Sequence, residues 1–267
     1  MIKLDISPLI AVHYETNDKD LLKSIHSIHY QKHIPNEIIL IQDGVITNSL
    51  NNLIYSLKDK NLINQHLVID KNCGLANALN LGIAKSKNLL IARLDPEDEI
   101  INDRFYVQYE FLKTNQDISI CGSFAYEVFN KKEKLIKKPI KSFDISHRLQ
   151  FSNPIIHSTV MFRKKMIEKI GSYPLIKKCQ DLYLWIKCLE EGYKFANIEL
   201  PLLRIYLHSD LILRRDINYF KFEKIIYDYQ LNKNLISFYV YIYQVMSRYI
   251  LRNLPSKLKV FLYRAIR

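Results

Sequence analysis

The first hundred residues alternate between short apolar runs and amphipathic runs, and this rhythm constrains the fold more than any other feature. The apolar runs have the length of strands, and the segments between them have apolar residues at helical spacing. Repeated strand–helix alternation is typical of a parallel sheet with helices on both faces, so we predict an α/β fold. The predicted strands are 8–14, 37–42, 66–70 and 88–94, and the predicted helices are 20–30, 48–58 and 75–85.

Polar residues follow each of these strands at the point where it ends. In parallel sheets, ligands bind beyond the carboxyl ends of the strands. The pattern alone therefore selects a short set of candidate binding residues: His13 to Glu15, Asp43, Asn72 and Asp95 to Asp98.

The second half of the chain has a different character. Residues 118–130 and 159–163 have strand patterns, and residues 142–150 and 181–191 have helical patterns. After Pro201 the chain is basic and aromatic without a strand pattern, so we expect only helices there.

The net charge and the cysteines indicate which partners and which cellular compartment suit this chain. The net charge of +12 favours an anionic partner, such as nucleic acid, a phosphate-bearing small molecule or an anionic membrane surface. The four cysteines form no CxxC pair, which indicates reduced thiols in the cytoplasm rather than disulfides or a zinc site. The N-terminus has no signal-peptide pattern, and no apolar run reaches the roughly 20 residues of a transmembrane helix.

The acidic stretch Asp95-Pro96-Glu97-Asp98 follows a buried strand directly. In an extended chain Asp95 and Glu97 point the same way, so their carboxylates converge and would need a cation between them. Hard divalent cations bind such oxygen ligands and bridge them to substrate phosphates. The alternative is a solvated turn in which Asp98 or Asp103 caps the next helix.

Three further residues stand in suggestive places, although each has an ordinary structural explanation. Asp43-Gly44 ends a strand and fits a simple turn. Asp181 opens an amphipathic helix, where the helix dipole favours an acid. His157 lies in a polar segment before a strand and fits a hydrogen-bonded loop histidine.

Several spaced stretches together carry a resemblance to a known family. They are LIAVHYE, EIILIQDGVIT, NCGLANALNLGI, LIARLDPEDEIINDRF, NPIIHSTVMFRK, GSYPLIKKCQDLYLWIKCLEEGYKFANI and PLLRIYLHSD, from residue 9 to about 210. In this order the sequence resembles family 2 glycosyltransferases of the GT-A fold, in the amylovoran-type subgroup that builds bacterial surface polysaccharides. The tail after residue 210 also resembles that subgroup.

The resemblance implies a role for each matching position. Asp181 corresponds to the catalytic base, and Asp95 and Glu97 correspond to the motif that binds Mn²⁺ or Mg²⁺. His157 and Trp185 fall on the acceptor side. The nucleotide-binding positions are Ala11, His13, Glu15, Asp43, Asn72, Gly74, Asn77 and Arg93.

Four positions depart from the family pattern. Glu97 replaces the usual Asp of the metal motif, so Asp98 is an alternative ligand. Gln180 replaces the Glu that usually precedes the base. The other two departures are Asn77, in place of a basic residue, and Ser158, in place of Pro.

The implied function is an inverting, metal-assisted transfer from a nucleotide-diphospho-sugar, most simply a UDP-sugar, to a hydroxyl of a glycan or lipid-linked glycan. Residues 1–207 would form the GT-A domain, with a nucleotide-binding half of about 1–100 and an acceptor half of about 101–207. Two other functions stay open, a non-catalytic sugar-nucleotide-binding module and a basic nucleic-acid-binding protein. The first half lacks a basic aromatic sheet face, so we expect no nucleic-acid partner.

The remaining residues, 208–267, read as a basic, aromatic, helical tail. In PSKLKVFLYRAIR, apolar residues recur at helical spacing with basic residues on the other sides. This helix either packs on the catalytic domain or lies on the inner face of the cytoplasmic membrane with help from residues 236–251. The second alternative makes the enzyme a peripheral membrane protein.

Overall fold

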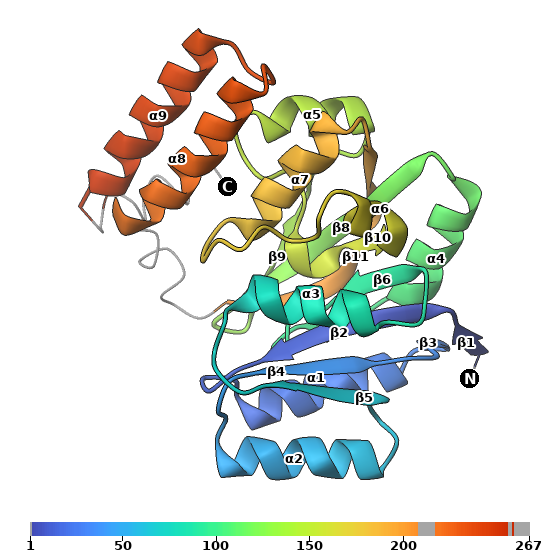
Figure 1. Ribbon diagram of the computed structural model, residues 1–267. Coiled ribbons are helices and arrows are strands. Elements are labelled where there is room, and N and C mark those ends of the chain that lie inside the picture. The colour runs from blue at the N-terminus through green and yellow to red at the C-terminus, as the bar shows by residue number, and fades with distance from the viewer. Residues whose placement is uncertain (1, 208–216, 256–257, 259–267) are drawn as a thin grey trace.

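The computed structural model describes residues 2–207, 217–255 and 258, and Figure 1 shows a twisted central sheet with helices on both faces. The strands are β1 (Ile2–Leu4), β2 (Ile6–Val12), β3 (His33–Pro35), β4 (Ile39–Asp43), β5 (Gln65–Ile69), β6 (Leu90–Arg93), β7 (Glu99–Ile100), β8 (Ile118–Phe129), β9 (Lys132–Ile136), β10 (Met161–Arg163) and β11 (Lys194–Tyr206). The helices are α1 (Asp18–His29), α2 (Asn48–Asp59), α3 (Leu75–Lys85), α4 (Arg104–Thr114), α5 (Ser142–Leu149), the 3₁₀ helix η1 (His157–Thr159), α6 (Lys164–Lys169), α7 (Gln180–Glu190), α8 (Ile217–Asn232) and α9 (Phe238–Asn253).

The predicted parallel sheet is confirmed in the first half of the chain. Strands β5, β4, β2 and β6 lie side by side in that order, and each neighbouring pair is parallel. Apolar side chains of successive residues enter opposite cores: Leu9 packs with α3, whereas Ile10 packs with α1 and α2. Both faces of these strands are therefore buried, which explains their nearly continuous apolar sequence.

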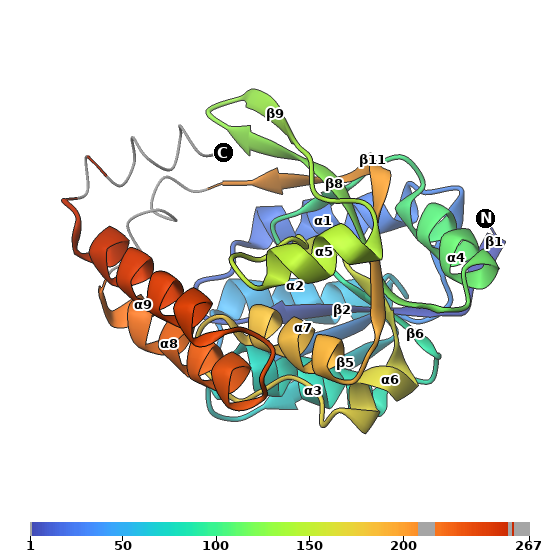
Figure 2. The same ribbon diagram turned by 90° about the horizontal axis from the view of Figure 1, so that it is seen from above.

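The second half of the chain continues the same sheet. Strand β10 is antiparallel to both of its neighbours, β6 and β8, and β11 is parallel to β8. Helices α5 and α7 contribute to the same core as α3, and α4 joins the core of α1 and α2 (Figure 2).

The expectation that no strand follows Pro201 is wrong. Strand β11 runs through Pro201, and its register against β8 shifts on both sides of that residue. Proline has no N–H for the ladder, and a bulge lets the strand pass it without an unpaired donor. The apolar pair Leu202–Leu203 then continues in the core.

Helices α8 and α9 form a hairpin that packs against α5 and α7 (Figure 1). A buried ion pair joins them: the Arg252 guanidinium donates to both carboxylate oxygens of Glu223, at 3.0 and 2.6 Å. The predicted C-terminal helix falls almost wholly on residues 256–257 and 259–267, which lie outside the described residues. None of the helices within the described ranges is both long and apolar enough to cross a bilayer.

Candidate functional site at the carboxyl edge of the sheet

The carboxyl ends of β2, β4, β5 and β6 lie along one edge of the sheet, because these strands are parallel. The loops that follow them carry the polar residues selected from the sequence: His13 to Glu15, Asp43, Asn72 and Asp95 to Asp98. The short helix that carries His157 contacts β6, and the helix that carries Asp181 packs in the same core as Ile91 of β6.

Asp43 holds the loop that follows β5. Its two carboxylate oxygens accept hydrogen bonds from the backbone N–H groups of Cys73 and Gly74, at 2.7 and 2.8 Å. Gly44 makes this approach feasible, because a Cβ there would lie 2.7 Å from the backbone nitrogen of Asn72. Asp43 is almost completely buried, so within this structure its carboxylate shapes the loop next to the predicted nucleotide site.

The same loop leads into α3. Gly74 precedes the first turn with a φ of 88°, a conformation that strains other residues, and no side chain caps this helix. The Asn77 side chain donates to the Cys73 carbonyl at 2.6 Å, and the Asn72 side chain donates to the Asp43 carbonyl at 3.3 Å. Asn72, Gly74 and Asn77 thus belong to one hydrogen-bonded unit at the edge.

The loop after β2 is more open. The side chains of His13 and Glu15 are exposed, with His13 Nε2 lying 3.9 Å from a Glu15 carboxylate oxygen. Thr16 fixes the other side of the ring, since its Oγ lies 3.1 Å from His13 Nδ1. Ala11, within β2, is half-buried. These residues are accessible to a ligand that lies across the strand ends.

The acidic stretch forms a turn, so the extended arrangement expected from the sequence is wrong. The backbone N–H of Asp98 donates to the Asp95 carbonyl at 3.1 Å and closes the turn. Pro96 explains the difference, because its fixed φ suits the second position of a turn. Asp95 and Glu97 are half-buried, whereas Asp98 is buried. The alternative of a turn is therefore correct, but the turn is not solvated and neither acid caps α4. Asp103 stands at the N-cap position, yet its carboxylate accepts from the backbone N–H of His33 instead.

Arg93 links the strand end to this turn. Its guanidinium is buried and donates to the Asp95 carboxylate and to the Leu94 carbonyl. The resemblance assigned Arg93 to nucleotide binding. In this structure one oxygen of Asp95 pairs with Arg93, and the other faces a partly exposed edge.

Asp98 is the most unusual group at this edge. Burial raises the pKa of its carboxyl well above the ordinary value, and the negative charge of Asp95 raises it further. The Ser158 hydroxyl and the Arg93 cation oppose that rise, but neither carboxylate oxygen has a hydrogen bond of ordinary geometry within the described structure. A buried acid without a partner is costly for folding alone, so it calls for another explanation.

Sequence reasoning missed Arg104, which lies fully buried beside Asp98. It donates to the Arg93 carbonyl at 2.8 Å and to the Gln108 side chain at 2.9 Å. Burial lowers the pKa of Arg104 to about 9, and the charge of Asp98 counteracts part of that effect. No local pattern marks this residue, since its backbone acceptors, the carbonyls of Arg93 and Val160, lie far from it in the sequence.

His157 lies between the acidic turn and α7. Its Nε2 is 2.9 Å from the Tyr173 hydroxyl, and its ring meets Trp185 edge-on at 6.2 Å between centroids. Burial lowers the pKa of His157, Asp181 and Asp95 act to raise it, and Arg93 acts to lower it further. Groups from both predicted halves therefore act on one imidazole.

Asp181 stands in the first turn of α7, as the sequence predicts. Its Oδ2 accepts a hydrogen bond from the Asn153 side chain at 2.7 Å. Its Oδ1 accepts none from the residues that the structure describes. One carboxylate oxygen is thus oriented by Asn153 and the other is available.

Asn153 and Tyr173 are further residues that the sequence analysis did not single out. The Asn80 side chain of α3 fixes Tyr173 by two backbone hydrogen bonds, at 2.8 and 2.9 Å. Both residues lie inside stretches that carry the resemblance, NPIIH and GSYP, which is the one signal that could have found them.

Unsatisfied buried polar atoms concentrate at this edge. Among the described residues, eight buried side-chain nitrogen or oxygen atoms lack a hydrogen-bond partner. Five of them belong here: Arg93 Nε, both carboxylate oxygens of Asp98, one terminal nitrogen of Arg104 and Trp185 Nε1. Buried polar atoms without a protein partner can bind an ordered water, an ion or a ligand, and here they lie around the predicted site.

The described residues contain no cluster of three or more histidine, cysteine or acidic side chains that could hold a metal ion alone. Mg²⁺ and similar ions are often held by one or two carboxylates together with substrate phosphates. Asp95, with one unpaired oxygen, and the adjoining acidic residues fit that kind of shared site.

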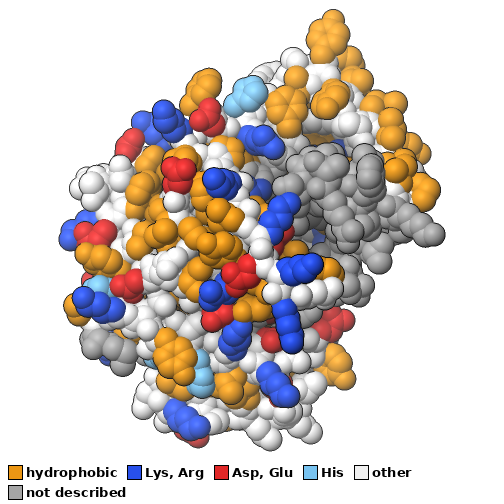
Figure 3. Space-filling view, turned by 180° about the vertical axis from the view of Figure 1, so that it is seen from behind, with side chains coloured by type: hydrophobic (Ala, Val, Ile, Leu, Met, Phe, Trp, Pro, Cys, Tyr) orange, Lys and Arg blue, Asp and Glu red, His pale blue; other side chains and the backbone are white. Residues whose placement is uncertain are grey.

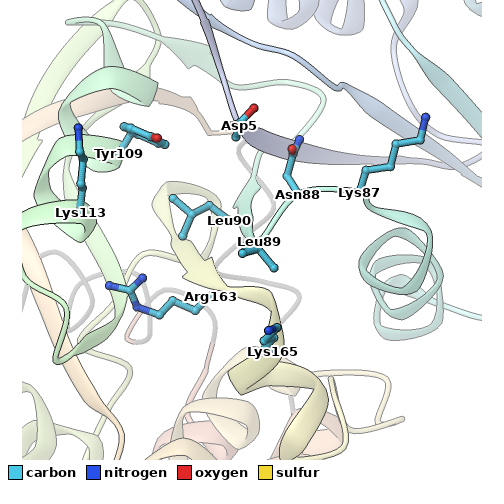
Figure 4. Close-up of a pocket in the computed structure, with 9 residues that line it drawn as sticks. All are labelled: Asp5, Lys87, Asn88, Leu89, Leu90, Tyr109, Lys113, Arg163 and Lys165. Carbon is cyan, nitrogen blue, oxygen red and sulfur yellow. The ribbon is translucent and has the colours of Figure 1, made fainter.

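A separate cavity of about 570 Å³ lies at the opposite edge of the sheet (Figure 4). Asp5 precedes β2 there, and Leu89 and Leu90 lie where β6 begins. Arg163 lines this cavity but already donates to the Ile118 and Leu112 carbonyls, which gives it a structural task. None of the predicted site residues lines this cavity.

Comparison with known proteins agrees with this architecture. A family model described as "Glycosyl transferase family 2" matches residues 8–171. The chain is 29% identical to the amylovoran biosynthesis glycosyltransferase AmsE of Erwinia amylovora, over 96% of this chain and 97% of that protein. It is 28% identical to a UDP-Gal:alpha-D-GlcNAc-diphosphoundecaprenol beta-1,3-galactosyltransferase of Escherichia coli, over 97% and 95% of the two chains.

Solved structures share the fold at low sequence identity. S. aureus TarS 1-349 in complex with UDP-GlcNAc matches with a TM-score of 0.68 at 12% identity, over 93% of this chain and 72% of that one. The mannosyltransferase PcManGT of Pyrobaculum calidifontis, in complex with GDP-Man and Mn²⁺, matches with a TM-score of 0.66 at 10% identity, over 98% and 73%. The chain has the GT-A fold and belongs to glycosyl transferase family 2.

Proposed function

We propose that this enzyme transfers a sugar, with inversion, from a UDP-sugar to a hydroxyl group of a lipid-linked surface glycan. The names of two nearly full-length relatives support this choice, since one makes amylovoran and the other uses UDP-Gal and a diphosphoundecaprenol acceptor. UDP is favoured over GDP because the relative named for UDP-Gal is much more similar in sequence than the one bound to GDP-Man.

One observation carries the proposal. Asp95 follows β6 and Asp181 opens α7, 86 positions later, yet both carboxylates act electrostatically on the same half-buried imidazole of His157. A donor-side carboxylate and an acceptor-side carboxylate that both act on one side chain suit a displacement between two bound substrates. In this scheme residues 1–207 are the catalytic domain, with the donor on about 1–100 and the acceptor on about 101–207.

The donor would lie across the strand ends. The loops with Ala11, His13 and Glu15 and the unit with Asp43, Asn72, Gly74 and Asn77 would hold the nucleoside, and Arg93 would bring positive charge beside the diphosphate. Asp95, with Glu97 or Asp98, would hold a divalent cation against the diphosphate. When bound, Mn²⁺ or Mg²⁺ neutralises charge on the leaving nucleotide.

The acceptor hydroxyl would meet Asp181. Asn153 holds Oδ2, which leaves Oδ1 to take the hydroxyl proton. The acceptor oxygen then forms a bond to the anomeric carbon as the bond to the β-phosphate oxygen breaks and UDP leaves. A single displacement inverts the anomeric centre, and general-base help of this kind is worth roughly 10²–10⁴-fold in rate.

His157 and Trp185 would shape the floor below the acceptor. Burial keeps the imidazole neutral near pH 7, because it lowers the pKa of His157 from its ordinary value. A neutral ring hydrogen-bonded to Tyr173 can orient a sugar without adding charge. The four cysteines are free thiols, which supports a reducing compartment such as the cytoplasm.

A thermal-shift panel of nucleotide sugars, each with and without Mn²⁺, tests the proposal. A ligand at 100 times its Kd adds about 2.7 kcal/mol to the free energy of unfolding. We expect UDP-sugars with Mn²⁺ to raise the melting temperature more than GDP-sugars do. Release of UDP in the presence of a lipid-linked acceptor then separates an enzyme from a binding module. Absence of any shift with UDP-sugars contradicts the donor assignment.

A further inference from the structure

Helix α9 buries polar side chains and exposes apolar ones, which is the reverse of the pattern expected for a helix on the surface of a globular protein. Its buried residues are polar: Gln244 and Arg252 face the protein, and the Arg248 side chain donates to the Phe151 carbonyl. Apart from Asn253 at its end, its exposed side chains are apolar or aromatic, namely Phe238, Tyr239, Ile242, Tyr243, Met246, Tyr249 and Ile250. These residues recur at intervals of three and four, so they form one outward stripe.

The inward polar residues are firmly held, so the orientation of α9 is well determined. Arg252 pairs with Glu223 of α8, and the Tyr241 hydroxyl donates to Asp228 at 2.9 Å. Rotating the helix to bury its aromatic stripe would break these contacts and expose an ion pair. The inward polar contacts therefore hold the stripe outward. Figure 3 shows hydrophobic side chains gathered at the upper right, where α8 and α9 lie.

Exposed apolar surface of this extent is typical of an interaction site rather than of a solvated helix. Three of the seven outward side chains are tyrosines, which combine an apolar ring with a hydroxyl that needs water or a polar partner. Tyrosine is enriched where a membrane meets water, because both needs are met there.

Charge selects the partner. From residue 229 to residue 267 the sequence contains no Asp or Glu and seven basic residues. Three of them are held by the protein itself: Lys233 by Glu190, Arg248 by the Phe151 carbonyl and Arg252 by Glu223. The other four, Lys257, Lys259, Arg264 and Arg267, follow α9 in the sequence. A second copy of this chain has the same net charge of +12 and would be repelled. An interface that excludes water would also leave the tyrosine hydroxyls without hydrogen-bond partners. An anionic lipid surface attracts the basic residues, at about 1 kcal/mol for each one near it.

We infer that the outward stripe of α9 docks this protein onto an anionic membrane surface. This surface is distinct from the transfer site, and its existence does not depend on the proposed reaction. The hairpin also contacts the helix of the proposed base: Tyr229 of α8 stacks edge-on against Tyr183 of α7, with 5.0 Å between ring centroids. Docking through α9 would therefore fix the orientation of α7 relative to the membrane.

The test is co-sedimentation of the full chain with vesicles of phosphatidylglycerol and phosphatidylcholine, compared with vesicles of phosphatidylcholine alone. The variant Tyr239→Ser/Tyr243→Ser removes two outward rings that are 85% and 64% exposed. The matched control Tyr30→Ser/Tyr55→Ser removes one ring at the end of α1 and one on α2, which are 83% and 54% exposed. Circular dichroism and UDP binding check that both variants are folded.

We expect the wild type and the control to bind phosphatidylglycerol vesicles equally, with binding that weakens as salt increases. We expect the α9 variant to bind at least about tenfold more weakly, because binding scales with the apolar area inserted. Equal binding by the α9 variant overturns the inference, since the basic residues then act alone. Failure of the wild type to bind also overturns it. A wild-type dimer in sedimentation equilibrium that the α9 variant disrupts assigns the stripe to a second copy instead.

Discussion

Asp98 at the carboxyl edge and Glu223 in the α8–α9 hairpin are both buried carboxylates close to a buried arginine, but their surroundings differ. Glu223 accepts two hydrogen bonds from Arg252. Asp98 has no hydrogen bond of ordinary geometry, although the charges of Arg93 and Arg104 act on it. A fully paired charge is explained by the fold alone, whereas a buried acid without a protein partner can bind water, an ion or a ligand.

The same contrast extends to the neighbours of these two residues. At the carboxyl edge, Arg93, Arg104 and Trp185 each have a polar atom without a partner. In the hairpin, Gln230 and Gln244 each have one amide atom without a partner, but the buried charges of Glu223 and Arg252 are paired, and the apolar side chains of α9 face outward. The carboxyl edge therefore has charged groups with unpartnered polar atoms, whereas the hairpin has an unpartnered apolar surface.

The largest effect is expected at the proposed base. Asp181→Asn keeps the hydrogen bond from Asn153 and removes the proton acceptor, so transfer should fall by roughly 10²–10⁴-fold. UDP binding should be retained. The control Glu190→Gln changes an acid at the other end of the same helix, and its rate should stay near that of the wild type. Turnover of Asp181→Asn above a tenth of the wild-type rate places the base elsewhere.

Breaking the paired charge should cost the most stability. Glu223→Gln leaves Arg252 buried without its carboxylate, which typically lowers the free energy of unfolding by about 3–5 kcal/mol. Urea denaturation measures this loss. The control Glu110→Gln touches only an exposed pair with Lys113 and should change stability by less than about 1 kcal/mol. A mild effect of Glu223→Gln removes the contrast between the two regions.

The unsatisfied charge should respond differently to the same substitution. Asp98→Asn replaces an acid that burial already favours in its neutral form, and it removes no hydrogen bond of ordinary geometry. We expect a change in the free energy of unfolding of less than about 1 kcal/mol. The same urea experiment decides, and a loss as large as that of Glu223→Gln shows that Asp98 is a structural ion-pair partner.

A smaller effect should appear in the pH dependence of stability. The lowered pKa of His157 means that below pH 6.5 the unfolded chain binds more protons than the folded one at this site. Stability should therefore decrease as the pH falls from 6.5 toward the folded pKa, by at most about 1.4 kcal/mol per pH unit for one proton. The groups that face this ring are Asp181, Asp95, Arg93, Tyr173 and Trp185.

His157→Gln should flatten that decrease. Urea denaturation at several pH values between 5 and about 7.5 spans the ordinary histidine pKa. It compares how the free energy of unfolding changes with pH in the wild type and in the variant. Identical slopes in the variant and the wild type show that His157 is not the group responsible.

The sequence predicted the scaffold well where structure is local. Apolar periodicity located the four parallel strands and three helices of the first hundred residues but not the short strands β1, β3 and β7. The helix Leu75–Lys85 has the predicted bounds. The carboxyl-edge rule then placed Asp43, Asn72 and Asp95 along one edge, because the direction of parallel strands follows from the alternation itself.

The sequence was least informative where pairing is long-range. The sequence analysis missed that β11 continues past Pro201. A proline is tolerated there because the strand bulges against β8 at that residue. The burial of Asp98 and the location of Arg104 depend on neighbours from other strands, and the two hydrogen bonds between Asn80 and Tyr173 join residues 93 positions apart. No periodicity reports such contacts, so the resemblance to a family was needed to find the acceptor side.

Calorimetric titration with UDP tests the central claim, that the carboxyl edge is a nucleotide-sugar site at which Asp95 shares a divalent cation with the diphosphate. Wild type is titrated with Mn²⁺ and then with EDTA, beside Asp95→Asn and the control Asp59→Asn, which changes an exposed acid at the end of α2. We predict that EDTA and Asp95→Asn each weaken UDP binding at least about tenfold, or 1.4 kcal/mol, and that Asp59→Asn does not. Equal affinity with Mn²⁺ and with EDTA, or unchanged affinity in Asp95→Asn, contradicts the claim.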